Sequence, residues 1–250
     1  MNKNTIFATI STALLIIGCG SKNPNGLPET MVNEPGDSTV YGLACDFNDS
    51  IIEVLPYDLS DPKTYDVLKA WKNRDIYGMP KVGDNVAIIL SDDGKSALKI
   101  INIDQLKGKW CYMEVPTLRR PSSMDDKQFA KLEAFVRDSL SDSVRAERFK
   151  PIEYGMTIED NNVVSCMGMA KANDDDAIIQ LAEYKKPRRY NAWKIFNGEL
   201  ILTKGTKQPV RDTVEFKIIK EDSLVIFFKD GPQSYYRKKT EEESSKNTDK

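Results

Sequence analysis

The stretch from Tyr190 to Thr203 reads YNAWKIFNGELILT and has the pattern of a β-hairpin. Two runs rich in strand-forming residues flank Asn197-Gly198, a dipeptide that strongly favours the two-residue turn of a hairpin. Strands joined by such a short turn are antiparallel. The segment therefore predicts an antiparallel β structure for the chain around it.

Further strands and turns are expected on both sides of this hairpin. The run 210–219 alternates, with Val214, Phe216 and Ile218 on one side. Other strands are expected at residues 108–114, 152–158, 163–169, 177–185, 223–228 and 233–237. About eight short strands in chain order favour an up-and-down antiparallel barrel at 105–239, because closing the sheet removes exposed edges.

One long helix is predicted between Pro121 and Pro151, at about residues 123–148. Its apolar stripe consists of Phe129, Leu132, Phe135, Val136, Leu140 and Val144. Ser122 or Ser123 can cap its start. Its other face carries charges of both signs, whereas a helix on a membrane surface needs a more uniformly basic face. We therefore expect the stripe to pack on the barrel domain.

Residues 40–104 are expected to form a small ββαββ domain before the barrel. Polar turns at 46–49 and 92–94 separate strand-like runs. Tyr65, Leu68 and Trp71 lie at helical spacing after a proline, which favours one short helix. The predicted fold class is thus mainly β with two helices.

The N-terminus has the features of an export signal. Lys3 precedes an apolar run, residues 6–17, that is too short to span about 30 Å of hydrocarbon. Residues 1–18 are therefore predicted to be a signal peptide. Ile16-Ile17-Gly18-Cys19 resembles the bacterial lipobox, which implies cleavage before Cys19 and a lipid on its thiol that anchors the chain in a membrane. The alternative is an ordinary signal peptide in which Cys19 has no role.

Two polar segments flank the expected folded part. Residues 19–39 are rich in Asn, Pro, Gly and Ser and are predicted to be a flexible tether. The charged segment 240–250 is predicted to be disordered. No acidic cluster follows Cys19, although surface-exported lipoproteins of Bacteroides-type bacteria typically have one. This difference from surface-exported lipoproteins predicts that the protein is anchored in the outer membrane and faces the periplasm.

Composition argues against several classes of protein. The 36 Lys and Arg residues nearly balance 38 Asp and Glu residues, so nucleic acid is not an expected partner. The chain has no histidine, which excludes His-based triads and the usual transition-metal centres, and we expect no cofactor. Cys45, Cys111 and Cys166 match no zinc spacing, and their odd number leaves at least one free thiol. We expect them to be small buried residues.

Several segments resemble a known family. The stretch 190–203, with Asp212-Thr213, residues 222–225 and residues 235–238, is similar to the lipocalin-like domain of lipoproteins from Bacteroides-type bacteria. Gly108-Lys109-Trp110 matches the first strand of that domain, so the resemblance covers about 106–239. It implies a small barrel that binds a lipid or another hydrophobic molecule, and it implies no catalytic residues.

The resemblance has one departure and one extension. The long helix departs from the family's pattern; in intracellular fatty-acid carriers, helices at this place cover the mouth of the barrel. The segment 40–104 looks like the companion domain often found before such barrels.

Two hypotheses for function follow. In the first, the barrel holds a small hydrophobic ligand, and its pocket is lined by Trp110, Trp193, Phe216, Ile218, Phe228 and Tyr236. In the second, these side chains fill the barrel, and the protein has a structural or interaction role with a partner that the sequence does not name. Near one strand end, Lys186, Arg188 and Arg189 either bind a carboxylate head group or belong to a solvated turn.

An enzyme is the third hypothesis and is not what we expect. Asp174-Asp175-Asp176 and Glu159-Asp160 could serve as acid or base groups or hold calcium. They lie in turns, where acidic residues are common. The sequence has no glycine-rich phosphate loop and no nucleophile elbow.

Overall fold

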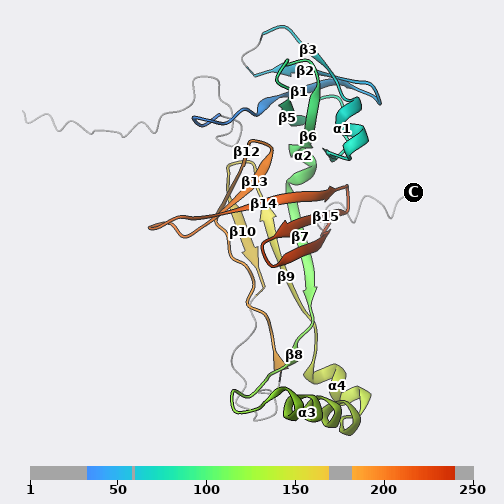
Figure 1. Cartoon of the computed structure of the whole chain (residues 1–250), viewed down its shortest axis with the longest axis vertical. Coiled ribbons are helices and arrows are strands. Elements are labelled where there is room, and N and C mark those ends of the chain that lie inside the picture. The colour runs from blue at the N-terminus through green and yellow to red at the C-terminus, as the bar shows by residue number, and fades with distance from the viewer. Residues whose placement is uncertain (1–32, 58–59, 169–181, 240–250) are drawn as a thin grey trace, which may run out of the picture.

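The computed structural model describes residues 33–57, 60–168 and 182–239. The predicted signal peptide, the lipidation residue Cys19, most of the predicted tether, Asp174-Asp175-Asp176 and the tail 240–250 lie outside the described residues. The described chain forms a six-stranded sheet, a barrel-like sheet and a helical arm, which follow one another along the long axis of the molecule (Figure 1).

The predicted barrel is present as an eight-stranded antiparallel sheet in the order β10-β9-β7-β16-β15-β14-β13-β12. Its strands are β7 (Gly108–Glu114), β9 (Ile152–Ile158), β10 (Val164–Met167), β12 (Ala192–Phe196), β13 (Glu199–Lys204), β14 (Val210–Ile219), β15 (Ser223–Phe228) and β16 (Gly231–Arg237). Apart from the β7–β16 pair, every neighbour in this order is also the next barrel strand along the chain. The mainly β, up-and-down architecture predicted from the sequence is confirmed.

The two edge strands of this sheet meet, so that the barrel is nearly closed. Val163 forms an isolated bridge with Ala192. The amide of Trp193 donates to the carbonyl of Asn162 at 2.8 Å. These few bonds join the start of β10 to the start of β12.

The Asn197-Gly198 hairpin is confirmed. Both residues have positive φ, 48° and 71°, as the favoured two-residue turn requires. Phe196 and Glu199 pair directly across it.

The turn also holds the chain that leads into the first strand. The Asn197 side-chain oxygen accepts from the Ser38 amide at 2.8 Å, and its Nδ2 donates to the Gly36 carbonyl at 3.2 Å. The Asn197 amide donates to the Asp37 carboxylate at 2.9 Å. Residues 33–39, the described end of the predicted tether, thus contact the barrel.

Replacing Asn197 with alanine is expected to lower the free energy of unfolding by about 1–2 kcal/mol, because alanine disfavours positive φ and the side-chain hydrogen bonds are lost. Hydrogen exchange at the Ser38 amide should accelerate. Asn197→Gly is the matched control, since it tolerates positive φ but makes no side-chain bond. Equal exchange at Ser38 in all three proteins would contradict the role of this contact.

Before the barrel, the chain forms a six-stranded sheet in the order β3-β2-β1-β5-β6-β4. Its strands are β1 (Val40–Phe47), β2 (Ile51–Pro56), β3 (Lys63–Asp66), β4 (Ile76–Tyr77), β5 (Asn85–Leu90) and β6 (Ala97–Asn102). Helix α1 (Leu68–Asn73) lies between β3 and β4, and helix α2 (Ile103–Leu106) leads into β7.

The predicted start of the first helix is wrong. Tyr65 lies in β3, where it pairs with Ile52 and is 5 % exposed. The helix begins only at Leu68. Burial of the Tyr65 ring against the sheet decides the conformation, and the helical spacing of three large residues is not enough to override it.

A separate small domain is not confirmed, because one hydrophobic cluster spans both sheets, although the first sheet also has a buried cluster of its own. Tyr41 and Tyr77 from the first sheet belong to the same buried cluster as Phe216 and the other barrel residues. The rings of Tyr77 and Phe216 lie 5.6 Å apart. The Tyr41 hydroxyl donates to the Ile195 carbonyl at 3.1 Å, so the contact is polar as well as apolar.

The single helix predicted at about 123–148 is also wrong in its extent. The structure has two helices, α3 (Asp126–Ser139) and α4 (Asp142–Arg148). Leu140 is extended, and Ser141 caps α4. The cap of α3 is Asp125, paired with Gln128 in a capping box, rather than Ser122 or Ser123.

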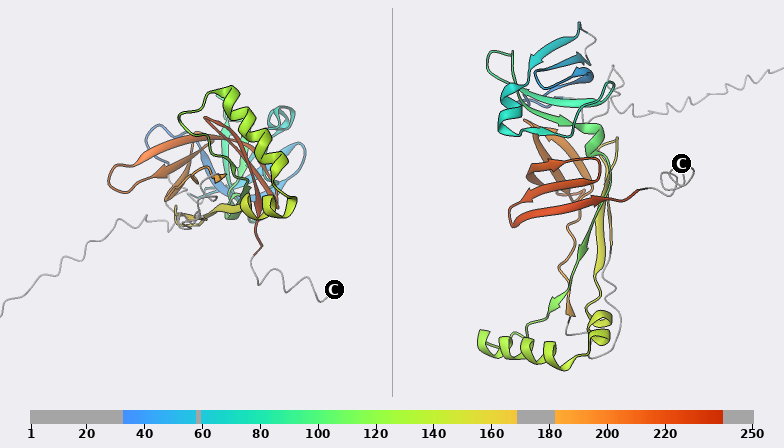
Figure 2. Two further views of the ribbon diagram at one scale, coloured as in Figure 1. Left: turned by 90° about the horizontal axis from the view of Figure 1, so that it is seen from below. Right: turned by 90° about the vertical axis from the view of Figure 1, so that its right-hand side faces the viewer.

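The helices do not pack on the barrel. Beyond Cys111, β7 pairs with no described strand on its β16 side, and β7 and β9 continue as a two-stranded ribbon. This ribbon and the short pair β8 (Thr117–Leu118) and β11 (Ala182–Glu183) carry α3 and α4 away from the barrel (Figure 2). No residue of α3 is buried by the described chain, and Phe135 is 67 % exposed. The expected packing of the stripe is therefore wrong.

Candidate functional site

Four of the six residues predicted to line a pocket lie inside the barrel and are at most 4 % exposed: Trp110, Trp193, Phe216 and Phe228. The Trp110 indole N–H donates to the Leu106 carbonyl at 2.7 Å, and that of Trp193 to the Glu159 carbonyl at 2.8 Å. Each ring is therefore held in one orientation within the core.

The other two predicted residues lie on the outside. Ile218 is 39 % exposed because a bulge between Phe216 and Ile218 breaks the alternation of β14. Tyr236 is 40 % exposed, and its hydroxyl donates to Glu153 at 2.6 Å. Its neighbour Tyr235 points inward and is 7 % exposed.

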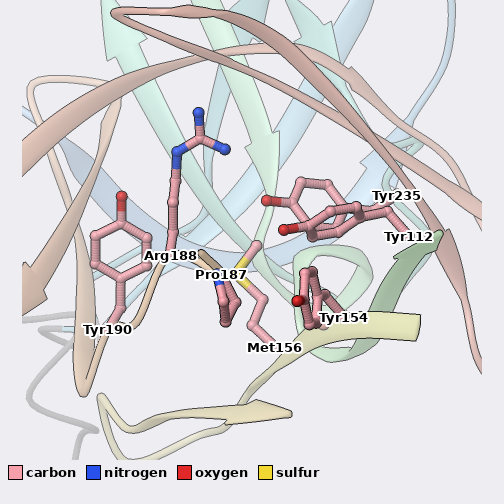
Figure 3. Close-up of a pocket in the computed structure, with 8 residues that line it drawn as sticks. Tyr112, Tyr154, Met156, Pro187, Arg188, Tyr190 and Tyr235 are labelled. Atoms are coloured by element: carbon pink, nitrogen blue, oxygen red, sulfur yellow. The ribbon is translucent and has the colours of Figure 1, made fainter. Parts of the chain in front are cut away.

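A small pocket lies where the β7–β9 ribbon leaves the barrel (Figure 3). It is lined by Tyr112, Tyr154, Gly155, Met156, Pro187, Arg188, Tyr190 and Tyr235. Its volume is about 10 Å³, which suffices for one water-sized group. This pocket cannot hold a hydrocarbon chain.

Three tyrosine rings form one wall of the pocket. The Tyr112 ring packs edge-on against Tyr235 at 5.3 Å and against Tyr154 at 5.8 Å. Tyr154 is fully buried, yet its hydroxyl has no hydrogen-bond partner among the described residues. No hydroxyl bond of Tyr112 or Tyr235 to another described residue is present either. In Figure 3, the hydroxyls of Tyr112 and Tyr235 point toward the side on which Arg188 lies.

Arg188 supplies the positive charge of the pocket. Its guanidinium lies 4.1 Å above the Phe228 ring, and its Nη2 bonds both carboxylate oxygens of Asp230. Burial opposes the charge, but the bond to Asp230 outweighs this and raises the pKa of Arg188. Lys186 and Arg189, the other cations predicted near this turn, are exposed and do not line the pocket.

The pocket tyrosines remain protonated at neutral pH. Burial is the largest cause that raises the pKa of Tyr112, Tyr154, Tyr190 and Tyr235. Their hydroxyls are therefore neutral groups that can both donate and accept.

We expect alkaline pH to destabilise the protein. A pKa raised in the folded state means that the folded chain holds the proton more tightly. The contribution to stability is therefore complete below the unfolded tyrosine pKa of about 10 and is lost as pH rises above it. Urea unfolding at a series of pH values, with tyrosinate absorbance of the native protein, measures this. Native tyrosines that all ionise with the ordinary pKa would contradict the burial of this cluster.

The remaining candidate groups do not line this pocket. Cys45, Cys111 and Cys166 are all free thiols, and burial raises the pKa of Cys111 and Cys166. Glu159 accepts a hydrogen bond from Ser165 at 2.7 Å, and Asp160 pairs with Lys107. Within the described ranges, no three acidic or thiol groups lie together in a way that could hold a metal ion.

Comparison with known proteins does not assign the chain to a family. No protein-family model matches the chain, and neither a curated protein nor a solved structure is significantly similar to it. Of the helices that the structure describes, none is both long and apolar enough to cross a membrane. The fold therefore defines the class: an antiparallel barrel-like β protein with a projecting helical arm.

Proposed function

We propose that the protein is a non-catalytic lipoprotein of the bacterial cell envelope, and that its filled barrel holds the helical arm in place for contact with a protein partner. One observation carries the proposal. The barrel core is occupied by its own side chains. By contrast, no residue of helix α3 is fully buried by the described chain, and Phe135 of its apolar stripe is 67 % exposed. A helix of this length is marginal in isolation and is normally stabilised by packing of its apolar face.

The N-terminal sequence supports the proposed location. A lipobox-like Ile16-Ile17-Gly18-Cys19 would place a lipid on Cys19 after cleavage. The absence of acidic residues directly after Cys19 favours the outer membrane, facing the periplasm. Such an anchor holds the chain in a membrane through acyl chains that contribute about 0.8 kcal/mol per buried CH₂.

A second candidate function is the binding of a lipid or another hydrophobic molecule, and one observation favours it. A pocket of about 230 Å³ lies on the arm and is lined by Leu118, Glu133, Val136, Arg137, Arg145 and Phe149. An apolar group would bind there and not in the barrel, whose core is filled.

Site-specific crosslinking in intact cells tests the partner role. A photo-crosslinking residue at position 135 of α3 should give adducts of discrete mass. The matched control has the same photo-crosslinking residue at position 227, where the native Phe227 of the barrel is 43 % exposed. It should give far fewer adducts. Equal or absent adducts at both positions would contradict a docking role for the arm.

Mass spectrometry of the gently purified protein tests the anchor and the second candidate. We expect an acyl-glyceryl modification on the peptide that begins with Cys19, and its loss in Cys19→Ser. An unmodified peptide would contradict the anchor. A lipid that co-purifies, and is lost on Val136→Asp, would favour the ligand-binding role.

A further inference from the structure

The tyrosine pocket has more hydrogen-bond donors than its own residues use. The Tyr154 hydroxyl is buried without a partner in the part of the chain that the structure describes, and leaving such a group unpaired is costly. The hydroxyls of Tyr112 and Tyr235 point toward the same side of the pocket (Figure 3). Tyr190 differs, because its hydroxyl donates to Asp212 at 3.0 Å.

Arg188 adds donors that Asp230 does not take. Asp230 occupies Nη2 alone. Nη1 and Nε of Arg188 make no hydrogen bond to another described residue, and stacking on Phe228 uses the face of the guanidinium and not its N–H edges. Both bidentate edges of a guanidinium include Nη2, so Nη1 and Nε can each donate singly to an incoming oxygen.

The lining favours an acceptor with negative charge. Arg188 is the only charged side chain among the pocket's lining residues. Asp230, the ion-pair partner of Arg188, is not among the lining residues. A volume of about 10 Å³ admits a single oxygen-sized group.

We propose that this pocket binds the carboxylate group of a small organic acid, with one oxygen between the hydroxyls of Tyr112, Tyr154 and Tyr235 and the other toward Arg188. Because the cavity admits a single oxygen, only the first oxygen lies inside it; the second oxygen, at Arg188, and the acid's carbon atoms lie outside. Arg188 is 30 % exposed in its side chain, so the pocket is reachable from solvent. This site is separate from the arm and goes beyond the proposed scaffold role.

Calorimetric titration of the mature chain with butyrate, at constant ionic strength, tests the site. We expect saturable binding of butyrate and none of 1-butanol, which has the same chain length but no charge. Tyr154→Phe should weaken butyrate binding about tenfold or more, since it removes a hydrogen bond to a charged group. Arg188→Gln should weaken it similarly.

Two controls keep the test decisive. Tyr236→Phe removes an exterior hydroxyl of the same kind and should leave binding unchanged. Tyr154→Phe should unfold in urea no earlier than the unmodified protein, because the hydroxyl it removes has no partner. No butyrate binding, equal binding of butanol, or undiminished binding by Tyr154→Phe would each overturn the proposal; a bound water would then account for the cavity.

Discussion

Replacing Trp110 with alanine is expected to lower the free energy of unfolding by about 3–5 kcal/mol. Trp110 is fully buried in the barrel core, so the substitution removes a large apolar ring and leaves a cavity. It also leaves the Leu106 carbonyl without its indole donor and removes the surface on which Arg237 stacks at 4.2 Å. For a domain with an ordinary free energy of unfolding, about 5–15 kcal/mol, this is a large part of the total stability.

Urea denaturation of both proteins measures this loss. Trp110→Phe separates the two causes, because it keeps most of the ring volume and removes the indole hydrogen bond. Phe135→Ala is the control for an aromatic deletion at an exposed position and should change stability by no more than about 0.5 kcal/mol. A loss below about 1 kcal/mol for Trp110→Ala would contradict a filled barrel, because a filled core cannot accommodate such a deletion cheaply.

The strand pattern of the barrel could be predicted from the sequence because it depends on local signals. Asn197-Gly198 specifies a hairpin through its tolerance of positive φ, and β15 and β16 are short runs bounded by turn residues. Such signals act within a few residues. They therefore hold in any tertiary context that keeps the strands paired.

The failures come from features that depend on distant parts of the chain. The bulge that turns Ile218 outward is set by pairing with β15, and the alternating sequence of residues 210–219 does not reveal it. Tyr65 is part of a strand because it pairs with Ile52 of β2. The placement of α3 depends on where β16 stops pairing with β7. In each case the conformation depends on pairing with another strand, and the local sequence pattern does not predict which strand that is.

The candidate site was predicted only in part. Arg188 was identified as a cation near a strand end, but the tyrosines around it come from strands far apart in the chain. Tyr235 could have been found, because alternation in β16 places either Tyr235 or Tyr236 inside, and register decides which. The unpaired hydroxyl of Tyr154 has no sequence signal at all.

The second large effect is expected from Tyr77→Ala, at about 3–4 kcal/mol, by analogy with the deletion of other large buried rings. Tyr77 lies in β4 of the first sheet, is 6 % exposed and packs on Phe216 of the barrel. The neighbouring Gly78 amide donates to the Ile219 carbonyl at 3.0 Å. Because the ring is part of a core that both sheets share, its removal should destabilise both of them.

Hydrogen exchange read peptide by peptide distinguishes one folding unit from two. If the sheets unfold together, Tyr77→Ala lowers protection in β1–β6 and in β12–β16 by the same free energy. Tyr65→Ala is the informative partner variant, since Tyr65 belongs to a cluster made only of residues from the first sheet. We expect it, too, to lower protection in the barrel strands. Loss confined to β1–β6 in Tyr65→Ala would mean that the first sheet unfolds by itself, and the shared core would then be a contact between two domains.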